Sequence, residues 1–484
     1  MNLRGKTVLV LGMGETGFSM AKWLSHLGAN VRAADSRAAP PCMAALRQAL
    51  PVTETFAGAF TAEAFTGMDA IAISPGVPLA EPLVQRAVKN GVPVVGDIEL
   101  FALAIRRLGI SKPKILAVTG SNGKTTVTAM VGAMAEKAGW DVEVAGNIGP
   151  AVLDTLMRRE DSGKLPQAWV LEVSSFQLET TQNLDPDAAA VLNLSEDHFD
   201  RYAGMRDYAA AKARIFLRGA HAADGGDGGD SGDGGGVQVL NRDDSVVCAM
   251  ALAGRRQMTF GLDTPVTDSD FGLLRDGANL WLAQGKTCLM KTGELGVTGL
   301  HNAANALAAL ALCRAVDLPF EPLLQALREF RGLPHRMEKV AAFNGITFYD
   351  DSKGTNVGAT IAALNGMTQR VVLIAGGDGK GQDFSPLARP VGEHARAVVL
   401  IGRDAKKIAS AIAGCGTPLH HAATMEEAVQ KSFMLARKGD AVLMSPACAS
   451  LDMFKSYAHR AEAFVAAVKD VRTGVSARIH NASN

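Results

Sequence analysis

The 484-residue sequence has few aromatic residues and no excess of charge of either sign. Phe, Trp and Tyr make up 5% of the chain, and 49 basic side chains are balanced by 49 acidic ones. Zero net charge excludes a global electrostatic field that would recruit nucleic acid or an anionic bilayer. Few aromatics beside plentiful Ala, Val, Leu and Gly favour helices packed on parallel sheets over an all-β sandwich.

Clustered cysteines and long apolar runs are also missing. The six cysteines are scattered without CxxC spacing, which argues against a zinc site and against a disulfide framework. The opening Met-Asn-Leu-Arg-Gly-Lys has no apolar signal core, and no segment reaches the length needed to cross a bilayer. We therefore expect a cytoplasmic monomer that neither inserts into membranes nor binds nucleic acid.

A short glycine-rich turn is the most informative motif that is present. It follows an apolar run at residues 114–119 and precedes a helix-forming segment at 127–138. A strand, a glycine turn and a helix N-terminus together form a phosphate cradle, in which Lys124 adds a cation and Thr125 can ligate magnesium. The motif indicates ATP or GTP, although two residues separate its glycines instead of the usual four. The predicted phosphate-binding residues are Gly120, Ser121, Asn122, Gly123, Lys124, Thr125 and Thr126.

The first hundred residues begin with a βαβ pattern. The tight turn Gly12-Met-Gly-Glu-Thr-Gly17 lies between a predicted strand at 7–12 and a predicted helix at 18–27, and Asp35 ends the next strand. This pattern is typical of dinucleotide binding, so an NAD-dependent dehydrogenase is one interpretation. The diphosphate of a UDP-sugar would satisfy the same turn. Ser74-Pro-Gly76 is a second turn after a strand, either at a ligand or as a plain connector.

Changes in composition divide the chain into three predicted domains. Apolar runs alternate with helical patterns throughout, which predicts parallel sheets. We expect an α/β protein with a Rossmann-like N-terminal domain (1–109), a central P-loop ATPase domain (110–332) and a Rossmann-like C-terminal domain (333–484). Residues 222–236 are almost wholly Gly, Asp, Ser and Ala, which predicts a flexible surface insertion, with a calcium-binding repeat as the alternative.

Two polar residues follow strands of the predicted central domain. Glu172 ends a strand at 168–173, and His198 follows a strand at 188–194 with Asp197 and Asp200 beside it. An acidic residue at the tip of a strand beside a P-loop can hold magnesium. The alternatives are a helix cap or surface pair for Glu172 and a capping role for His198.

Together these motifs resemble the Mur ligase family, ATP-dependent amide-forming enzymes of peptidoglycan precursor synthesis. The resemblance covers essentially the whole chain apart from the Gly/Asp insertion, and the short phosphate loop is the form that this family uses. Three further motifs, at residues 350–356, 376–381 and 445–452, look like those of the members that add D-glutamate to UDP-N-acetylmuramoyl-L-alanine. The motifs that carry the resemblance to the family are residues 119–125, 172–179, 193–200, 301–305 and 333–338.

The resemblance implies a reaction and its catalytic groups. ATP would phosphorylate the alanyl carboxylate to an acyl phosphate, which the amine of D-glutamate then attacks. Lys212 aligns with a lysine that is carbamylated in the family, and a carbamate replaces an ammonium that would repel magnesium. On its pattern alone, Lys212 is an ordinary helix lysine. The implied catalytic residues are Lys124, Glu172, His198 and Lys212, and the implied ligands of two magnesium ions are Thr125, Glu172, His198 and carbamylated Lys212.

The resemblance also implies residues that bind each substrate. Further contacts to ATP are implied for Asn302, Asn305, Arg336, Asp351 and Lys353. Contacts to the UDP-sugar substrate are implied for Thr16, Asp35, Ser36, Arg37, Ser74, Gly76 and Asn147. Contacts to D-glutamate are implied for Thr355, Lys380, Ser450, Leu451 and Tyr457, the last in place of the phenylalanine expected there.

Three rival interpretations remain at this point. A folylpolyglutamate synthetase belongs to the same family but would not need a UDP-binding first domain. A dehydrogenase fused to an NTPase would bind a nicotinamide cofactor. A non-catalytic nucleotide-binding scaffold would not need acidic, histidine and lysine positions in all three domains.

Overall fold

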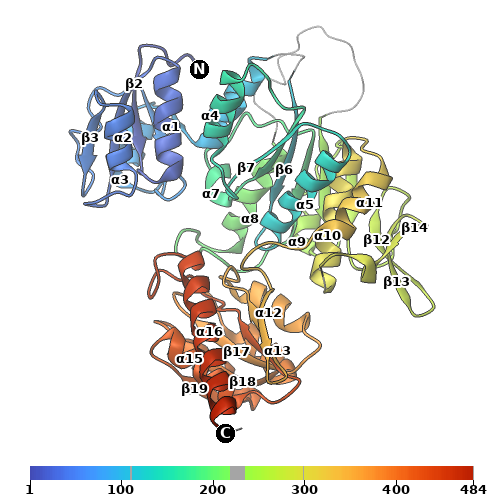
Figure 1. Ribbon diagram of the computed structural model, residues 1–484. Coiled ribbons are helices and arrows are strands. Elements are labelled where there is room, and N and C mark those ends of the chain that lie inside the picture. The colour runs from blue at the N-terminus through green and yellow to red at the C-terminus, as the bar shows by residue number, and fades with distance from the viewer. Residues whose placement is uncertain (109–111, 218–234, 298, 483–484) are drawn as a thin grey trace. The chain divides into compact units, whose positions relative to one another are not determined.

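The computed structural model describes residues 1–108, 112–217, 235–297 and 299–482. Within these residues the chain forms three β-sheets in succession, each accompanied by helices (Figure 1). The first predicted domain boundary, and most of the predicted insertion at 222–236, lie outside the described residues. Among the described helices, none is both long and apolar enough to cross a membrane.

The first sheet is parallel throughout, in the order β3-β2-β1-β4-β5. Its central strand β1 is almost wholly buried, as its apolar run predicts. The glycine turn leads from β1 into α1, which begins at Glu15 instead of the predicted residue 18. The elements are β1 (Thr7–Leu11), α1 (Glu15–His26), β2 (Asn30–Asp35), α2 (Met43–Ala49), β3 (Glu54–Ala57), β4 (Ala70–Ile73), α3 (Pro82–Lys89) and β5 (Val94–Val95), followed by α4 (Asp97–Arg106).

The second sheet has the order β14-β13-β12-β11-β10-β9-β6-β8-β7 in the described part of the chain. The strands from β7 to β12 run parallel, whereas β12, β13 and β14 form an antiparallel extension that the sequence analysis missed. The strands are β6 (Lys114–Thr119), β7 (Val142–Gly146), β8 (Ala168–Glu172), β9 (Ala188–Val191), β10 (Val237–Asn241), β11 (Gln257–Phe260), β12 (Phe271–Asp276), β13 (Asn279–Gln284) and β14 (Thr287–Lys291).

The helix predicted after the phosphate loop is present, but it begins earlier than predicted. Helix α5 begins at Lys124, three residues before the predicted start, because Gly123 adopts a left-handed φ of 84° and turns the chain directly into the helix. Helix α8 is followed directly by a short 3₁₀ turn, η2. The helical elements are α5 (Lys124–Lys137), α6 (Val152–Asp161), α7 (Ser175–Leu178), α8 (Met205–Ala213), η2 (Arg214–Phe216), α9 (Ser245–Cys248), α10 (Leu300–Ala315) and α11 (Phe320–Glu329).

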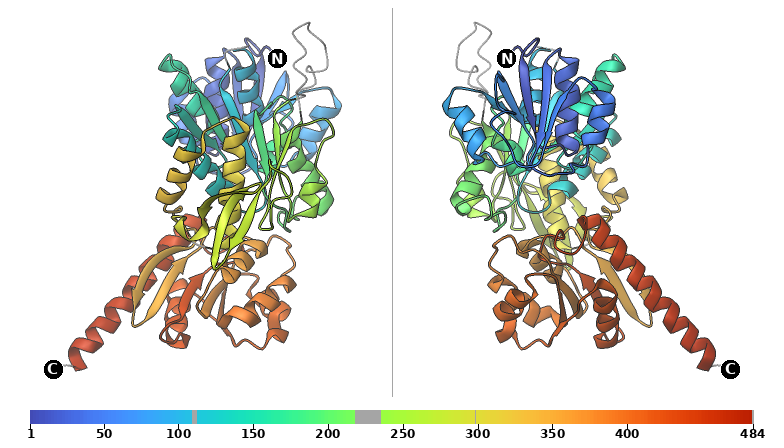
Figure 2. Two further views of the ribbon diagram at one scale, coloured as in Figure 1. Left: turned by 90° about the vertical axis from the view of Figure 1, so that its right-hand side faces the viewer. Right: turned by 90° about the vertical axis from the view of Figure 1, so that its left-hand side faces the viewer.

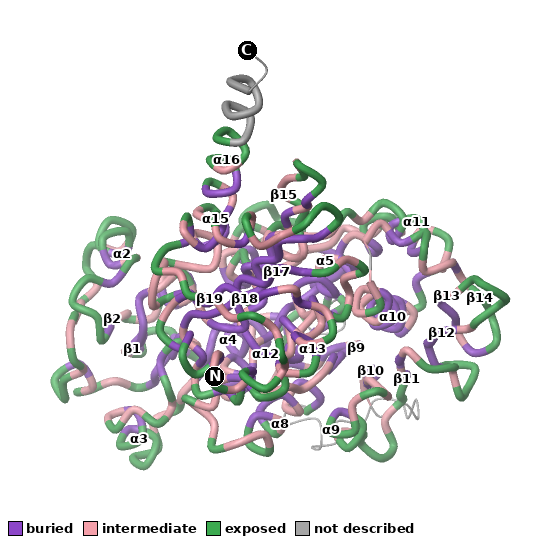
Figure 3. The backbone as a smooth tube through the Cα atoms, turned by 90° about the horizontal axis from the view of Figure 1, so that it is seen from below, coloured by how far each residue is buried: buried purple, intermediate pink, exposed green. Residues whose placement is uncertain are grey.

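The third sheet has the order β15-β16-β20-β17-β18-β19, parallel except for the antiparallel edge strand β15. Strands β17 and β18 lie in the buried interior, whereas α16 extends away from the sheet (Figures 2 and 3). The elements are β15 (Glu338–Phe343), β16 (Ile346–Asp350), α12 (Val357–Asn365), β17 (Val371–Gly376), α13 (Ala388–His394), β18 (Ala395–Ile401), α14 (Ala405–Ile412), β19 (Leu419–His421), α15 (Met425–Leu435), β20 (Ala441–Met444) and α16 (Tyr457–Ala482).

Spatial contacts group the chain into two compact units. The first unit holds residues 1–193, 206–292 and 305–328, and the second holds residues 194–205, 293–304 and 329–484. Two short segments, 194–205 and 293–304, follow strands of the second sheet in the sequence but are grouped with the third sheet. The site residues are therefore described separately for each unit.

Candidate functional site

The phosphate loop of the first unit is fixed by one asparagine. Strands β6 and β9 are neighbours, and Asn193 follows the end of β9. Asn122 N donates to Asn193 Oδ1 at 2.8 Å, Asn193 Nδ2 donates to Asn122 O at 3.1 Å, and Ser121 N donates to Asn193 O at 2.8 Å. The sequence analysis quoted Asn193 only as part of a motif, because its pairing with the loop depends on strand order.

The two predicted catalytic lysines of this unit contact the same carbonyl oxygen. Lys124 Nζ donates to Gly120 O at 2.8 Å and to Ser121 O at 2.9 Å. Lys212 is 1% exposed, and its Nζ donates to Gly120 O at 2.9 Å and lies 4.6 Å from the centre of the Tyr208 ring. The Tyr208 hydroxyl is 3.2 Å from Ser121 Oγ. The structure thus places Lys212 at the phosphate loop and not on an exposed helix face.

Glu172 lies at the same edge of the sheet as the loop. It ends β8 opposite Val118 of β6 and is 1% exposed. Its Oε1 accepts a hydrogen bond from Asn147 Nδ2 at 2.6 Å, and its buried Oε2 has no hydrogen-bond partner among the described residues. A buried carboxylate oxygen without a donor is costly unless it meets a cation. The capping box of α7 is formed by Ser174 and Gln177, so Glu172 is not the cap.

The glycine turn of the first sheet is closed by Asp35. Its Oδ2 accepts from Met13 N at 2.6 Å and from Arg37 Nη2 at 2.6 Å, and its Oδ1 accepts from Arg37 Nε at 2.8 Å. Burial opposes ionisation of Asp35, but the bonds from Arg37 and the Met13 amide outweigh it and lower the pKa to about 2. Since both oxygens are engaged within the chain, Asp35 has little capacity left for a ribose, which disfavours the dehydrogenase interpretation.

Other residues predicted for the UDP-sugar lie around this turn. Ser74 Oγ donates to Gly12 O at 2.7 Å, and a Cβ at Gly17 would lie 1.7 Å from the same oxygen. The turn therefore requires glycine at position 17. Thr16 is half-buried, whereas Ser36, Arg37 and Gly76 are exposed.

The second unit contains the residues predicted for D-glutamate. Lys380 Nζ is 2.5 Å from Asp197 Oδ1, and it lines a cavity of about 580 Å³ beside Gly381 and Arg403. Ser450 is buried, and Thr355 precedes Asn356, the N-cap of α12. Leu451 is 73% exposed. His198, predicted as a magnesium ligand, belongs to this unit and stands next to Asp197.

Residues predicted to contact ATP also lie in this unit. Asp351 is buried and accepts from Ser445 Oγ at 2.7 Å, and burial raises its pKa to about 7. Lys353 Nζ is 3.4 Å from the Tyr457 hydroxyl and 4.8 Å from the centre of its ring. The positive charge of Arg336 opposes this rise in the pKa of Asp351. Asn302 lies in the first turn of α10.

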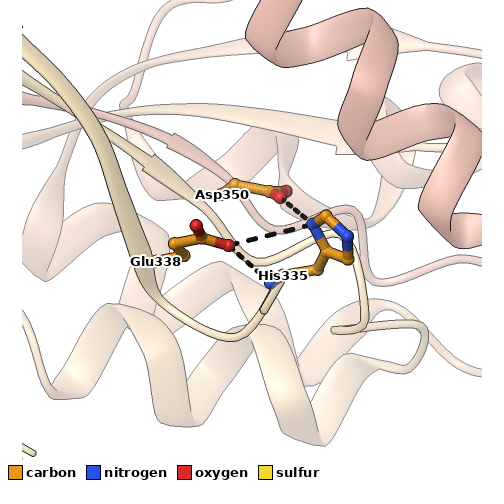
Figure 4. A group of neighbouring side chains, drawn as sticks. All are labelled: His335, Glu338 and Asp350. Atoms are coloured by element: carbon orange, nitrogen blue, oxygen red, sulfur yellow. Dashed lines mark hydrogen bonds and ion pairs between the residues drawn. The ribbon is translucent and has the colours of Figure 1, made fainter. Parts of the chain in front are cut away.

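A histidine and two carboxylates form a compact cluster that the sequence analysis did not single out (Figure 4). The ligand atoms of His335, Glu338 and Asp350 lie within 4.8 Å of one another. His335 Nδ1 is 2.8 Å from Asp350 Oδ2, and His335 N donates to Glu338 Oε2 at 2.8 Å. Ser352 N donates to Asp350 Oδ1 at 2.9 Å. These bonds stabilise the turn before β15 and account for the cluster without a metal.

Three family descriptions match successive parts of the chain. They are the Mur ligase MurD-like N-terminal domain at residues 6–96, the Mur ligase middle domain at 118–313 and the Mur ligase glutamate ligase domain at 335–448. The chain belongs to the Mur ligase family. Its three sheets lie in the three matched parts, so the predicted fold of three tandem α/β domains is confirmed.

Members of the Mur ligase family match along nearly the full chain. The UDP-N-acetylmuramoylalanine--D-glutamate ligase of Nitrosospira multiformis is 70% identical over 472 residues, covering 98% of this chain and 97% of that protein. The enzyme of the same name from Nitrosomonas europaea is 64% identical over 469 residues, covering 97% of each. Among solved structures, UDP-N-acetylmuramate-alanine ligase MurC from Thermotoga maritima has a TM-score of 0.58 at 19% identity, covering 96% of this chain and 99% of that chain.

Gly123 provides a test of the phosphate loop. A Cβ at Gly123 would lie 2.5 Å from Asn305 Oδ1, on top of the strain of a left-handed φ. We predict that Gly123→Ala weakens ATP binding, measured by calorimetry with magnesium, by at least about tenfold, or about 1.4 kcal/mol. Gly139→Ala is the matched control at the other end of α5, because its φ is 87° and nothing lies within 4 Å of the added Cβ. Equal ATP affinity in the two variants would contradict the role of the loop.

Proposed function

We propose that this chain is an ATP-dependent ligase that joins D-glutamate to UDP-N-acetylmuramoyl-L-alanine in peptidoglycan precursor synthesis. The observation that carries the proposal is the 70% identity, over 98% of the chain, to the Nitrosospira multiformis enzyme named for this reaction. A phosphate loop at the edge of a parallel sheet supports it chemically, because a ligase of this kind must bind a nucleoside triphosphate. We assign UDP-sugar binding to residues 1–109, ATP binding to 110–332 and D-glutamate binding to 333–484.

The reaction has two bond-forming steps. A carboxylate oxygen of the alanyl group attacks the terminal phosphorus of ATP, and ADP leaves. The amine nitrogen of D-glutamate then attacks the carbonyl carbon of the acyl phosphate, phosphate leaves with the shared oxygen, and the nitrogen loses a proton. Both steps bring anions together, so the protein must supply positive groups and exclude water.

The phosphate loop supplies the first set of these groups. The backbone N–H groups at the start of α5 would bind the phosphates, because the positive end of the helix dipole favours their charge. Lys124, which donates to Gly120 O and Ser121 O, exchanges these carbonyl oxygens for the terminal phosphates when ATP binds. Asn305 lies next to Gly123 and so borders the same loop, as its predicted contact with ATP requires.

Magnesium fits the donor set at this edge. Glu172 offers the buried Oε2 that lacks a hydrogen-bond partner, and Thr125 offers a hydroxyl in the first turn of α5. Hard cations such as magnesium prefer oxygen ligands of this kind. When bound, the ion neutralises charge on the phosphates. Asn147 holds the other oxygen of Glu172, so it orients this carboxylate as well as serving the predicted substrate contact.

We propose that Lys212 is carbamylated and that His198 serves a second magnesium ion. As an ammonium, Lys212 shares Gly120 O with the ammonium of Lys124, which brings two positive charges to one carbonyl. Carbamylation would turn this repulsion into attraction between an anion and Lys124, and would add an oxygen ligand for the metal. The proposal for His198 rests on the family resemblance.

The remaining assignments concern the two substrates that are joined. Arg37, which is 53% exposed at its side chain while Asp35 holds it, is proposed to reach the uridine or diphosphate of the UDP-sugar. Lys380 at the 580 Å³ cavity, with Thr355, Ser450 and Tyr457, is proposed to bind D-glutamate.

Phosphate release from ATP tests the function directly. We predict that purified protein releases phosphate only when UDP-N-acetylmuramoyl-L-alanine and D-glutamate are both present. L-glutamate, L-lysine and D-alanyl-D-alanine serve as competing acceptors, and none of them should replace D-glutamate. Release that is independent of either substrate, or that is equally fast with another acceptor, would contradict the assignment.

The carbamate has its own test. We predict that Lys212→Ala lowers the turnover number by at least about tenfold, in the range seen when groups that support a metal are lost. Added formate or acetate should restore part of the turnover, because a short carboxylate can occupy the place of the carbamate. Lys137→Ala, an exposed lysine on α5, is the control and should need no carboxylate. A Lys212→Ala variant with full activity, or one that no carboxylate rescues, would remove the carbamate from the mechanism.

A further inference from the structure

Asp197 is a buried carboxylate in the second unit that the proposed reaction does not yet use. It is 5% exposed. Its Oδ1 lies 2.5 Å from Lys380 Nζ and accepts from His198 N at 2.9 Å, and its Oδ2 accepts from Asn356 Nδ2 at 3.1 Å. Three donors from three segments thus converge on one side chain.

These contacts join the two loops that carry predicted D-glutamate residues. Lys380 lies in the loop after β17 and has a left-handed φ of 52°. Asn356 lies in the loop after β16, next to Thr355, and its Oδ1 accepts from Ala359 N at 2.8 Å as the N-cap of α12. Because Asp197 holds both, it fixes one loop relative to the other. It comes from a third segment, residues 194–205, which follows the asparagine that holds the phosphate loop.

The chain itself supplies the positive charge that balances Asp197. Both of its oxygens are engaged by donors of the chain, and the Lys380 ammonium stands where a cation would otherwise stand. The pair is well shielded from water, since the side chains of Lys380 and Asp197 are 14% and 7% exposed. A shielded pair of this kind holds its geometry, whereas an exposed pair is loose and screened.

The ammonium of Lys380 has donors to spare. A lysine ammonium has three N–H groups, and Asp197 takes one. Lys380 lines the 580 Å³ cavity of this unit, while the other cations there are held by acids: Arg403 pairs with Asp378, and Lys407 Nζ is 2.8 Å from Asp404. The acidic partner of Lys380, Asp197, is not among the residues that line this cavity, whereas Asp378 and Asp404 are.

We propose that Asp197 is a positioning residue for the incoming amino acid: it holds the Lys380 ammonium so that its remaining N–H groups meet a carboxylate of D-glutamate. This inference rests on the proposed function. Asp197 has two opposing effects on the binding of D-glutamate: it positions Lys380, and its negative charge repels the substrate carboxylate. Positioning wins because Lys380 without Asp197 would be a shielded charge with no acidic partner, on a side chain that is free to change rotamer.

The test is a comparison of Michaelis constants. Asp197→Asn should raise the KM for D-glutamate by at least about tenfold, and leave the KM values for ATP and the UDP-sugar within about twofold of wild type. Asp207→Asn makes the same substitution at an exposed carboxylate of α8. It should alter none of the three KM values. In a Lys380→Met background, Asp197→Asn should change the KM for D-glutamate by less than about twofold, because Asp197 acts through Lys380.

Several results would overturn the proposal. A lower KM for D-glutamate would mean that charge repulsion dominates, and an unchanged KM would mean that Asp197 does not position Lys380. An equal rise in all three constants would indicate a general structural role. If Asp197→Asn does not fold, Asn356→Ser carries the test, since serine keeps the N-cap of α12 but cannot donate the amide bond to Asp197. It should raise the KM for D-glutamate alone, and no change would contradict the proposal. A wild-type enzyme that does not use D-glutamate would instead refute the proposed function.

Discussion

The hydrogen bonds between Asn193 and the phosphate loop are the constraint on which the rest of the site depends. They tie the loop after β6 to the end of β9 at three points. A glycine turn with two residues between its glycines is too short to fix its own conformation. Asn193, just after the neighbouring strand β9, therefore fixes the conformation of the loop, and the first N–H groups of α5 can serve phosphates.

The surrounding side chains are arranged to balance charge around that loop. Lys124 and Lys212 both reach the Gly120 carbonyl, while Glu172 presents a buried oxygen without a donor at the end of the adjacent strand. Like charges repel, and a shielded carboxylate needs a partner. A triphosphate would attract both lysines, and a divalent cation would meet the buried oxygen of Glu172. The loop therefore fits the nucleotide that the proposed function requires.

The sequence predicted the parts of this picture that depend on local patterns. Strand β6 occupies the predicted residues, and the glycine turn leads into a helix as expected, because apolar runs and glycine positions are read over a few residues. It could not predict which side chains meet across the sheet. Asn193 pairs with a residue 71 positions away, and Asp197 pairs with Lys380 across 183 positions. The antiparallel strands β12 to β14 were also missed, although they pair across short turns, because the analysis looked for strands that alternate with helices.

The central claim is that the loop hands the terminal phosphate of ATP to a carboxylate, and the path of one oxygen atom tests it. UDP-N-acetylmuramoyl-L-alanine labelled with ¹⁸O in its alanyl carboxylate should be turned over with ATP, magnesium and D-glutamate, and the released phosphate analysed by mass spectrometry. Transfer through an acyl phosphate predicts one ¹⁸O atom in each phosphate formed. Phosphate without ¹⁸O, released while the amide product forms, would contradict the account.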